Sequence, residues 1–267
     1  MVSGDGVILV DKPAGVSSAA AVAAVKRRLA RGVKVGHAGT LDPFATGLLL
    51  VLVGRATRVQ RFLVALPKTY LAVARFGAVS FTGDPEGEIV VTGAVPAGDL
   101  ELPVGVVRQR PPAYSALHVG GQRAYRLARQ GASVQLPERE VRVYRFEERW
   151  RAGDRRGFEI ECSTGTYVRS LISVLGDAYC EELRRVRIGP FDVANADDEW
   201  LVGLDEALSF LPCVRLSGSH ARLAAHGGAV PGSGFDGPVR LIDEEGLIGV
   251  GEPRGSEMVR PVVVLRG

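Results

Sequence analysis

The chain has 267 residues, of which 46% are hydrophobic and 24% charged, and its formal net charge is +3. These values are typical of globular proteins, so we expect one large domain with a smaller one, and we exclude a disordered, fibrous or single small module. No apolar run approaches the roughly 18 residues that a membrane helix needs. Three widely spaced cysteines exclude a disulfide framework and a cysteine-type zinc site. The N-terminus lacks the basic region of a signal peptide, which predicts a cytoplasmic protein.

Strands and helices are expected to alternate in the first part of the chain. Short apolar runs predict buried strands over 7–10 and 48–53, and an alternating pattern predicts a strand over 70–76. Helices are expected over 56–66 and, with Ser17 or Ser18 as N-cap, up to about Leu29. The stretch KVGHAGTLDPFATG (34–47) is too polar and glycine-rich for a core element, yet apolar segments flank it. That profile is typical of a functional loop.

The remaining chain predicts further mixed elements and then a different tail. We expect turns and short strands over 77–112, a helix over 125–130, paired strands over 139–151 and 158–163, a helix over 168–179 and a strand over 183–188. After Glu206 the chain is glycine-rich, with strand signals at 239–242, 247–250 and 259–265. This pattern predicts an α+β domain over 1–205 and a small β-rich domain over 206–267.

Basic residues concentrate in the first three quarters of the chain. Residues 105–156 hold twelve arginines and five acidic residues, whereas the tail from Glu206 holds six arginines and seven acidic residues. A second basic cluster, 26–34, contains no acid. Such an excess suits a polyanion, because each neutralised phosphate releases counterions. Charge alone also fits a solvated surface or an arginine-rich genome composition.

Several kinds of chemistry can be excluded from the motifs. The sequence has no Walker loop, no dinucleotide-binding glycine motif after a strand and no G-x-S-x-G elbow. Its four histidines form no dense ligand set, so we expect neither a metal nor a small-molecule cofactor. A triad of Ser17, His37 and Asp42 can be drawn, but nothing supplies an oxyanion hole. Asp42 in its glycine-rich loop remains, although a lone Asp-Pro is ordinarily a turn starter.

The strings around Asp42 resemble a known signature. The stretch GHAGTLDPFATGLL, with GVILVDKPAGVSS before it and KTYLA after it, resembles that of the TruB family of tRNA pseudouridine synthases. RPPAYSALHVGGQRAYRLARQG, CSTGTYVRSL and ELRRVRIGPF follow in the family's order, so the resemblance spans roughly Gly4 to Val193. The tail resembles the small PUA RNA-binding domain. The segments near 95–108 and 176–181 look shorter than is usual in the family, through deletions or through residues missing from this numbering.

This resemblance implies a pseudouridine synthase with a mixed-sheet catalytic domain and a C-terminal PUA-like domain. Such an enzyme isomerises uridine to pseudouridine at position 55 in the T arm of tRNA, by base flipping and without cofactor or metal. Asp42 matches the catalytic carboxylate, which acts either as nucleophile at C1′ or as the base that forms a glycal. Arg169 matches its arginine partner. Tyr70 matches the aromatic residue that stacks on the base and can accept the C5 proton.

The resemblance also implies substrate-binding residues. His37 matches the residue that fills the space left by the flipped base, Leu183 matches a pocket-lining residue, and Lys12 belongs to a supporting motif. Arg108, Arg110 and Arg123 lie in a stretch that corresponds to an RNA-gripping loop. For His37, Leu183 and Lys12, a purely structural role remains an alternative.

Two other functions are open at this point. The catalytic subunit of guide-RNA-dependent archaeal and eukaryotic particles shares the same chemistry, but it usually carries terminal extensions, so the stand-alone bacterial type is favoured. An RNA-binding or RNA-folding module without turnover is the alternative from another class, and the set Asp42, Tyr70 and Arg169 argues against it as the sole role. We expect a monomer that binds the T stem-loop of tRNA and no membrane.

Overall fold

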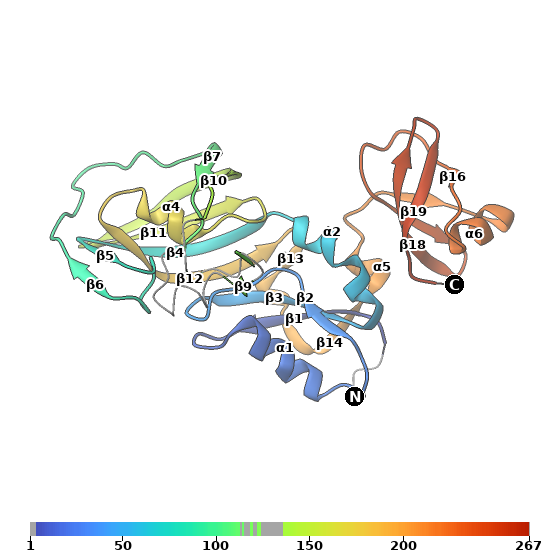
Figure 1. Ribbon diagram of the computed structural model, residues 1–267, viewed down its shortest axis with the longest axis horizontal. Coiled ribbons are helices and arrows are strands. Elements are labelled where there is room, and N and C mark those ends of the chain that lie inside the picture. The colour runs from blue at the N-terminus through green and yellow to red at the C-terminus, as the bar shows by residue number, and fades with distance from the viewer. Residues whose placement is uncertain (1–3, 113, 115–117, 120–121, 124–135, 267) are drawn as a thin grey trace.

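The computed structural model describes residues 4–112, 114, 118–119, 122–123 and 136–266. Within these residues the chain forms a ten-stranded mixed sheet and, nearer the C-terminus, a separate five-stranded sheet (Figure 1). Two small two-stranded ribbons accompany them, β5 (Ala78–Ser80) with β6 (Ile89–Val91), and β8 (His118–Val119) with β9 (Gln122–Arg123). None of the helices in the described part is long and apolar enough to cross a membrane.

The large sheet has the strand order β14-β1-β3-β12-β4-β11-β10-β7, with β2 beside β3 and β13 beside β12. Its strands are β1 (Gly6–Lys12), β2 (Val35–His37), β3 (Thr46–Val53), β4 (Lys68–Phe76), β7 (Gly105–Gln109), β10 (Arg139–Ala152), β11 (Arg155–Cys162), β12 (Ala178–Ile188), β13 (Phe191–Asp192) and β14 (Asp197–Gly203). The helices beside it are α1 (Ser18–Arg27), α2 (Gln60–Ala65), α4 (Val168–Ser173) and α5 (Leu204–Ala207), with 3₁₀ turns η1 (Gly54–Val59) and η2 (Val193–Asn195).

Helices cover both faces of the sheet near β1 and β3. Helix α1 packs Ala21 and Val25 against one face, which includes Ile8. Helix α2 places Leu63 on the opposite face, which includes Leu50. Since both faces are covered, strand β3 reads as a continuous apolar run, TGLLLVLV, rather than as an alternating pattern. Helix α4 packs on the neighbouring part of the sheet formed by β4, β11 and β12.

The sequence-predicted strands over 7–10, 48–53 and 70–76 are confirmed within β1, β3 and β4. Ser17 is the N-cap of α1, where its side chain accepts a hydrogen bond from Ala20 N. The predicted helix over 56–66 instead starts as a 3₁₀ turn and becomes α-helical at Gln60. The functional loop contains the short strand β2. The helix expected over 125–130 lies outside the described residues.

The predicted helix over 168–179 is wrong in its second half. Helix α4 ends at Ser173, Gly176 adopts a positive φ of 137°, and strand β12 begins at Ala178. The residues from Ala178 to Cys180 are buried beside β4. A short apolar run carries no periodicity that separates a buried strand from a helix, which explains the error. The predicted strand over 183–188 is therefore only the second half of β12.

The C-terminal sheet has the order β15-β17-β18-β19-β16 and packs against α6 (Gly218–Ala225), a helix that the sequence did not predict. Its strands are β15 (Cys213–Arg215), β16 (Val230–Pro231), β17 (Val239–Asp243), β18 (Gly246–Arg254) and β19 (Met258–Val264). It lies beyond α2 and α5 (Figure 1). Val59 and Phe62 share an apolar cluster with Val250 and Leu265, so the two sheets are joined by a packed contact.

Strands β3 and β12 pair in parallel over only two positions, where Thr46 and Gly47 face Arg184 and Arg185. Gly47 has a φ of +102°, and a Cβ there would lie 2.2 Å from the Arg185 carbonyl oxygen. Only glycine fits this close approach. The junction holds the start of β3, and hence the loop before it, against β12.

We predict that Gly47→Ala lowers the free energy of unfolding by about 3 kcal/mol, because the new Cβ adds a clash to a strained backbone. Urea unfolding followed by circular dichroism measures this loss. Gly153→Ala is the matched control, since Gly153 also has a positive φ (+60°) but no atom within 4 Å of its Cβ position. The control should lose only about 1 kcal/mol. An equal loss of unfolding free energy in the two variants would contradict the close approach of Gly47 to the Arg185 carbonyl oxygen.

Candidate active site

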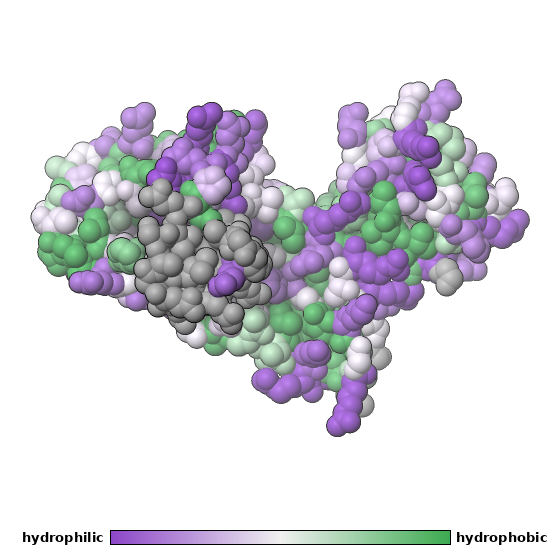
Figure 2. All heavy atoms as spheres, in the orientation of Figure 1, coloured by the Kyte–Doolittle hydropathy of each residue, from purple (hydrophilic) through white to green (hydrophobic). Residues whose placement is uncertain are grey.

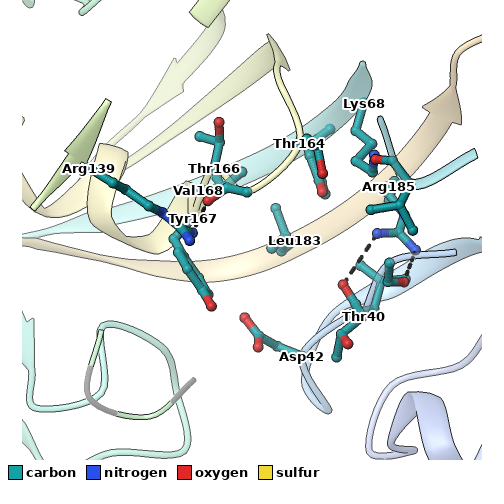
Figure 3. A pocket seen from close by; sticks show the side chains of 15 residues that line it. Thr40, Asp42, Lys68, Arg139, Thr164, Thr166, Tyr167, Val168, Leu183 and Arg185 are labelled. Atoms are coloured by element: carbon teal, nitrogen blue, oxygen red, sulfur yellow. Dashed lines mark hydrogen bonds between the residues drawn. The ribbon is translucent and has the colours of Figure 1, made fainter. Parts of the chain in front are cut away.

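A pocket of about 360 Å³ opens where the loop between β2 and β3 meets β4, β12 and the start of α4 (Figure 3). Its lining combines one carboxylate, three cations, two tyrosines and three threonines with apolar residues. The lining residues are Gly39, Thr40, Leu41, Asp42, Val64, Lys68, Tyr70, Arg139, Thr164, Gly165, Thr166, Tyr167, Val168, Leu183 and Arg185.

Asp42 lies in a loop that the first helix and strand hold in place. Ser18, at the start of α1, accepts a hydrogen bond from Leu41 N at 2.8 Å and donates one to Leu41 O at 3.0 Å. The buried Lys12 Nζ donates to the carbonyl oxygens of Pro13, Val16 and Pro43 at 2.7–3.2 Å. These bonds fix the backbone on both sides of Asp42, so its carboxylate is positioned before any substrate arrives.

Arg169 lies between two carboxylates. Its Nε is 2.9 Å from Asp42 Oδ2, an ion pair rather than an aligned hydrogen bond, and its Nη1 donates to Asp84 Oδ2 at 2.8 Å. The carbonyl oxygens of Thr82 and Tyr114 accept the other bonds, at 2.8 and 2.9 Å. The Arg169 side chain is only 3% exposed, so these partners leave it little freedom.

Asp84 is itself anchored in the loop after β5. Its Oδ1 accepts hydrogen bonds from the Thr82 hydroxyl and from Glu86 N. Cys180 N donates to Gly83 O at 3.0 Å, which ties this loop to β12. Asp84 is 4% exposed, and its other oxygen is directed to Arg169. It therefore orients Arg169 from the side opposite to Asp42.

Burial raises the pKa of the Asp42 carboxyl above its ordinary value. The charges of Arg169 and Lys12 lower it, and the repulsion from Asp84 raises it further. The net direction of the Asp42 pKa shift is upward. Arg169 limits the rise and keeps the ionised form accessible.

Three further residues form another wall of the pocket. Arg185 donates from Nε to Leu48 O at 2.7 Å and from its two terminal nitrogens to Thr40 O and Gly39 O at 3.3 and 3.2 Å. Its guanidinium also contacts the hydroxyl of Tyr70, whose pKa burial raises to about 12. Burial together with Arg185 lowers the pKa of Lys68 to about 8. Tyr70 is therefore a neutral phenol at neutral pH.

The structure brings together most of the residues that the sequence singled out. Asp42, Tyr70 and Leu183 line the pocket, and Arg169 lies directly behind Asp42. Lys12 supports the loop without lining the pocket. His37 ends β2 opposite Val51 and is outside the lining.

The arginines predicted to grip RNA are not among the residues that line the pocket. Arg108 and Arg110 are exposed on and just after the edge strand β7, where they pair with Glu140 and Glu138. The backbone of Arg123 belongs to β9, and its side chain is outside the described residues. Figure 2 shows hydrophilic side chains gathered over β7 and β10.

Sequence reasoning missed Asp84, Lys68 and Arg185. Lys68 and Arg185 belong to the strings KTYLA and ELRRVRIGPF, but a charged residue in a strand is ordinarily read as solvent-facing. Asp84 belongs to TGDPEG, which reads as a plain turn.

The binding of a metal ion needs a group of ligand side chains that lie close together. In the part of the chain that the structure describes, no group of three or more histidine, cysteine, aspartate and glutamate side chains gathers in a way that could hold a metal ion. The ionisable groups of the pocket are one carboxylate, a phenol pair and cations, which suits proton transfer and charge stabilisation.

Comparison with known proteins decides the family. The family model described as TruB family pseudouridylate synthase, N-terminal domain, matches residues 26–168. The tRNA pseudouridine synthase B of Mycobacterium bovis is 40% identical over 294 aligned positions, which cover 99% of this chain and 97% of the relative. The chain belongs to the TruB family of pseudouridylate synthases. Another family member, the tRNA pseudouridine synthase B of Thermobifida fusca, is 42% identical over 98% of this chain and 99% of its own length.

Solved structures agree with membership of the TruB family. The crystal structure of a Cbf5-Nop10-Gar1 complex matches with a TM-score of 0.71 and 27% identity, covering 97% of this chain and 83% of that chain. The mixed-sheet domain and the separate C-terminal sheet fit the catalytic and PUA-like parts expected from the sequence. The chain is thus a pseudouridine synthase, an isomerase that acts on RNA. The alignment with the first relative is longer than this chain of 267 residues, so that relative carries segments that this chain lacks.

We predict that Asp84→Asn shifts the acid limb of the pH–rate profile to lower pH. The negative charge of Asp84 raises the pKa of Asp42, so removing it lowers that pKa and keeps Asp42 ionised to lower pH. Single-turnover pseudouridine formation over the acid range measures the shift. Glu88→Gln, an exposed carboxylate of the same loop, is the control and should leave the limb in place. A limb that stays fixed or moves to higher pH in Asp84→Asn would contradict the coupling.

Proposed function

We propose that this enzyme isomerises uridine to pseudouridine in tRNA, at position 55 of the T arm. The observation that carries the proposal is the ion pair between Asp42 and the buried Arg169 inside a pocket lined by Tyr70 and Leu183. The relatives that match over nearly the whole chain are named tRNA pseudouridine synthase B, and the sequence strings around the pocket resemble that signature.

In this mechanism Asp42 acts on the ribose of the target nucleotide. The bond between N1 and C1′ breaks, the uracil turns in the pocket, and C5 bonds to C1′; the C5 proton leaves and N1 takes up a proton. Asp42 either attacks C1′ or removes a ribose proton to form a glycal. Both routes need an ionised carboxylate, which Arg169 supports against the effect of burial.

A uridine in a folded T loop reaches this pocket only after it flips out of the stack, at a cost of a few kcal/mol. Tyr70 and Leu183 offer a face on which the base can stack, and stacking contributes about 1–3 kcal/mol per base. Tyr70 is also the candidate acceptor for the C5 proton. We assign His37 to the space that the flipped base leaves, and Lys12 to support of the Asp42 loop.

Arginines outside the pocket are proposed to grip the phosphate backbone. Arg108 and Arg110 are exposed, and among the described residues each is paired with one glutamate at the same sheet edge, so phosphates can compete for them. We assign the same phosphate-binding role to Arg123, on the basis of its sequence motif. The catalytic domain would comprise 1–205, and the domain over 206–267 would add RNA affinity.

The stand-alone enzyme is favoured over a guide-RNA-dependent subunit. Identity is 40% and 42% to the two relatives named tRNA pseudouridine synthase B that are given above, but 27% to the chain in the Cbf5-Nop10-Gar1 complex. We therefore propose a monomer that acts in the cytoplasm on tRNA without a guide RNA and without a small-molecule cofactor.

We predict that the protein alone converts one uridine of an unmodified T-arm hairpin, and that Asp42→Asn binds this hairpin but does not convert it. The amide keeps the size and polarity of the side chain while removing the charge that acts on the ribose. Pseudouridine mapping at nucleotide resolution measures conversion, and filter binding measures affinity.

A hairpin with cytidine at the target position is the control for site selection. Conversion at other uridines of that hairpin would overturn the T-arm assignment. A near-normal rate in Asp42→Asn would remove Asp42 from the mechanism.

A further inference from the structure

Two buried cations line one end of the pocket. In Figure 3, Lys68 and Arg185 lie at one end, Arg139 and Tyr167 lie at the other, and Leu183 lies between them. Lys68 is 5% exposed and Arg185 is 1% exposed. Of the charged lining residues that the structure describes, only Asp42 is acidic, and Arg169 already pairs with it. The lining therefore carries an excess of positive charge.

The partners that the structure describes for these two cations are electrically neutral. Lys68 Nζ donates to Val64 O at 2.8 Å and to Leu66 O at 2.6 Å, at the end of α2. Arg185 donates to three carbonyl oxygens and contacts the Tyr70 hydroxyl. Burying a charge without a counter-charge costs several kcal/mol. Neutral donors could hold the same carbonyl groups at a lower cost. The Lys12 charge is attracted by Asp42, whereas the Lys68 charge is repelled by Arg185, so the charges of Lys68 and Arg185 call for another explanation.

The proposed reaction produces a matching anion. When the bond between N1 and C1′ breaks, its electron pair remains on N1, and the detached uracil carries one negative charge shared with its carbonyl oxygens. The charge disappears when C5 bonds to C1′, the C5 proton leaves and N1 is protonated, so atoms and electrons balance without an oxidant or reductant.

The detached base must also turn so that C5 replaces N1 beside the ribose. A directional hydrogen bond to one base atom would have to break during this turn. The attraction of a buried cation depends chiefly on distance and persists in a site of low dielectric constant. Fixed charges that meet developing charge are among the strongest means of lowering a barrier.

We propose that Lys68 and Arg185 stabilise the uracil anion while it is detached from the ribose. This inference rests on the proposed function. It gives a role to the wall formed by Lys68 and Arg185, in addition to the role of the Asp42–Arg169 pair. Arg185 also positions the loop through Gly39 O and Thr40 O, so Lys68 is the cleaner residue to vary.

The chain offers a matched control for Lys68. Lys12 is also a buried lysine whose Nζ is bound to backbone carbonyl oxygens, and it holds the same loop through Pro43 O, but it does not line the pocket. Lys68→Met and Lys12→Met therefore remove equivalent groups that differ in their access to the base.

The experiment compares T-arm hairpins with uridine or 5-fluorouridine at the target position, under single-turnover conditions at saturating RNA. Fluorine withdraws electrons and makes the uracil a better leaving anion, which needs less stabilisation. Lys68→Met should slow loss of the target uridine by about 10²-fold. The factor by which it slows loss of 5-fluorouridine should be at least about tenfold smaller, because the better leaving anion needs less stabilisation from Lys68. Lys12→Met should slow both substrates by the same factor.

Lys68→Arg supplies a second readout, because arginine keeps its charge at every accessible pH. The parent rate should fall above pH about 8, where Lys68 loses its proton, and the Lys68→Arg rate should not. The neighbours of Lys68 are the cationic Arg185 of β12, Cys162 of β11 and Tyr70 of its own strand, while α2 presents only carbonyl groups. Burial raises the pKa of Cys162 to about 11 and that of Tyr70 to about 12, so neither titrates there.

Equal slowing of the two substrates by Lys68→Met, or no slowing, would overturn the proposal while leaving the proposed function intact. Failure of the parent enzyme to convert the uridine hairpin would overturn the proposed function itself.

Discussion

The two ion pairs of the Arg169 guanidinium hold the site together. The guanidinium is buried, and it meets the Asp42 carboxylate on one side and the Asp84 carboxylate on the other. A buried carboxylate without such a cation would be neutralised by protonation, and a buried guanidinium without carboxylates would be strongly destabilising. Arg169 therefore makes the charges of both carboxylates tolerable, and the two carboxylates make its own buried charge tolerable. The fold has to bring together α4, the loop before β3 and the loop after β5 to build it.

Strand β12 provides the common support for these segments. It pairs with β4, which carries Lys68 and Tyr70, and it meets β3 at the close contact of Gly47. From β12, Arg185 reaches back to the carbonyl groups of the Asp42 loop. The same strand carries Leu183 into the pocket. Rigid strands thus hold groups that come from distant parts of the sequence, which is how a pocket is prepared before its substrate binds.

Strands and pocket residues that depend on a local pattern or motif could be predicted from the sequence. Strands β1 and β3 follow from apolar runs and β4 from an alternating pattern, and Asp42, Tyr70 and Leu183 follow from the resemblance. Asp84 was missed because its bond to Arg169 spans 85 positions and its turn has no chemical signature. Lys68 and Arg185 were missed because their burial depends on the whole sheet. The first half of β12 was taken for helix, since a short apolar stretch buried beside β4 shows no period that separates a strand from a helix.

The role of Asp84 in holding Arg169 beside Asp42 is tested most directly by a double-mutant cycle. It is run on the plateau of the pH–rate profile, where the effect of the Asp84 charge on the Asp42 pKa does not change the rate. The single-turnover rate at saturating RNA is measured for Asp84→Asn, Arg169→Met and the double variant. If Asp84 acts by holding Arg169, Asp84→Asn slows the parent enzyme but has no further effect beside Arg169→Met, with a coupling energy of about 1–3 kcal/mol. A slowing by the same factor in both backgrounds would contradict this role.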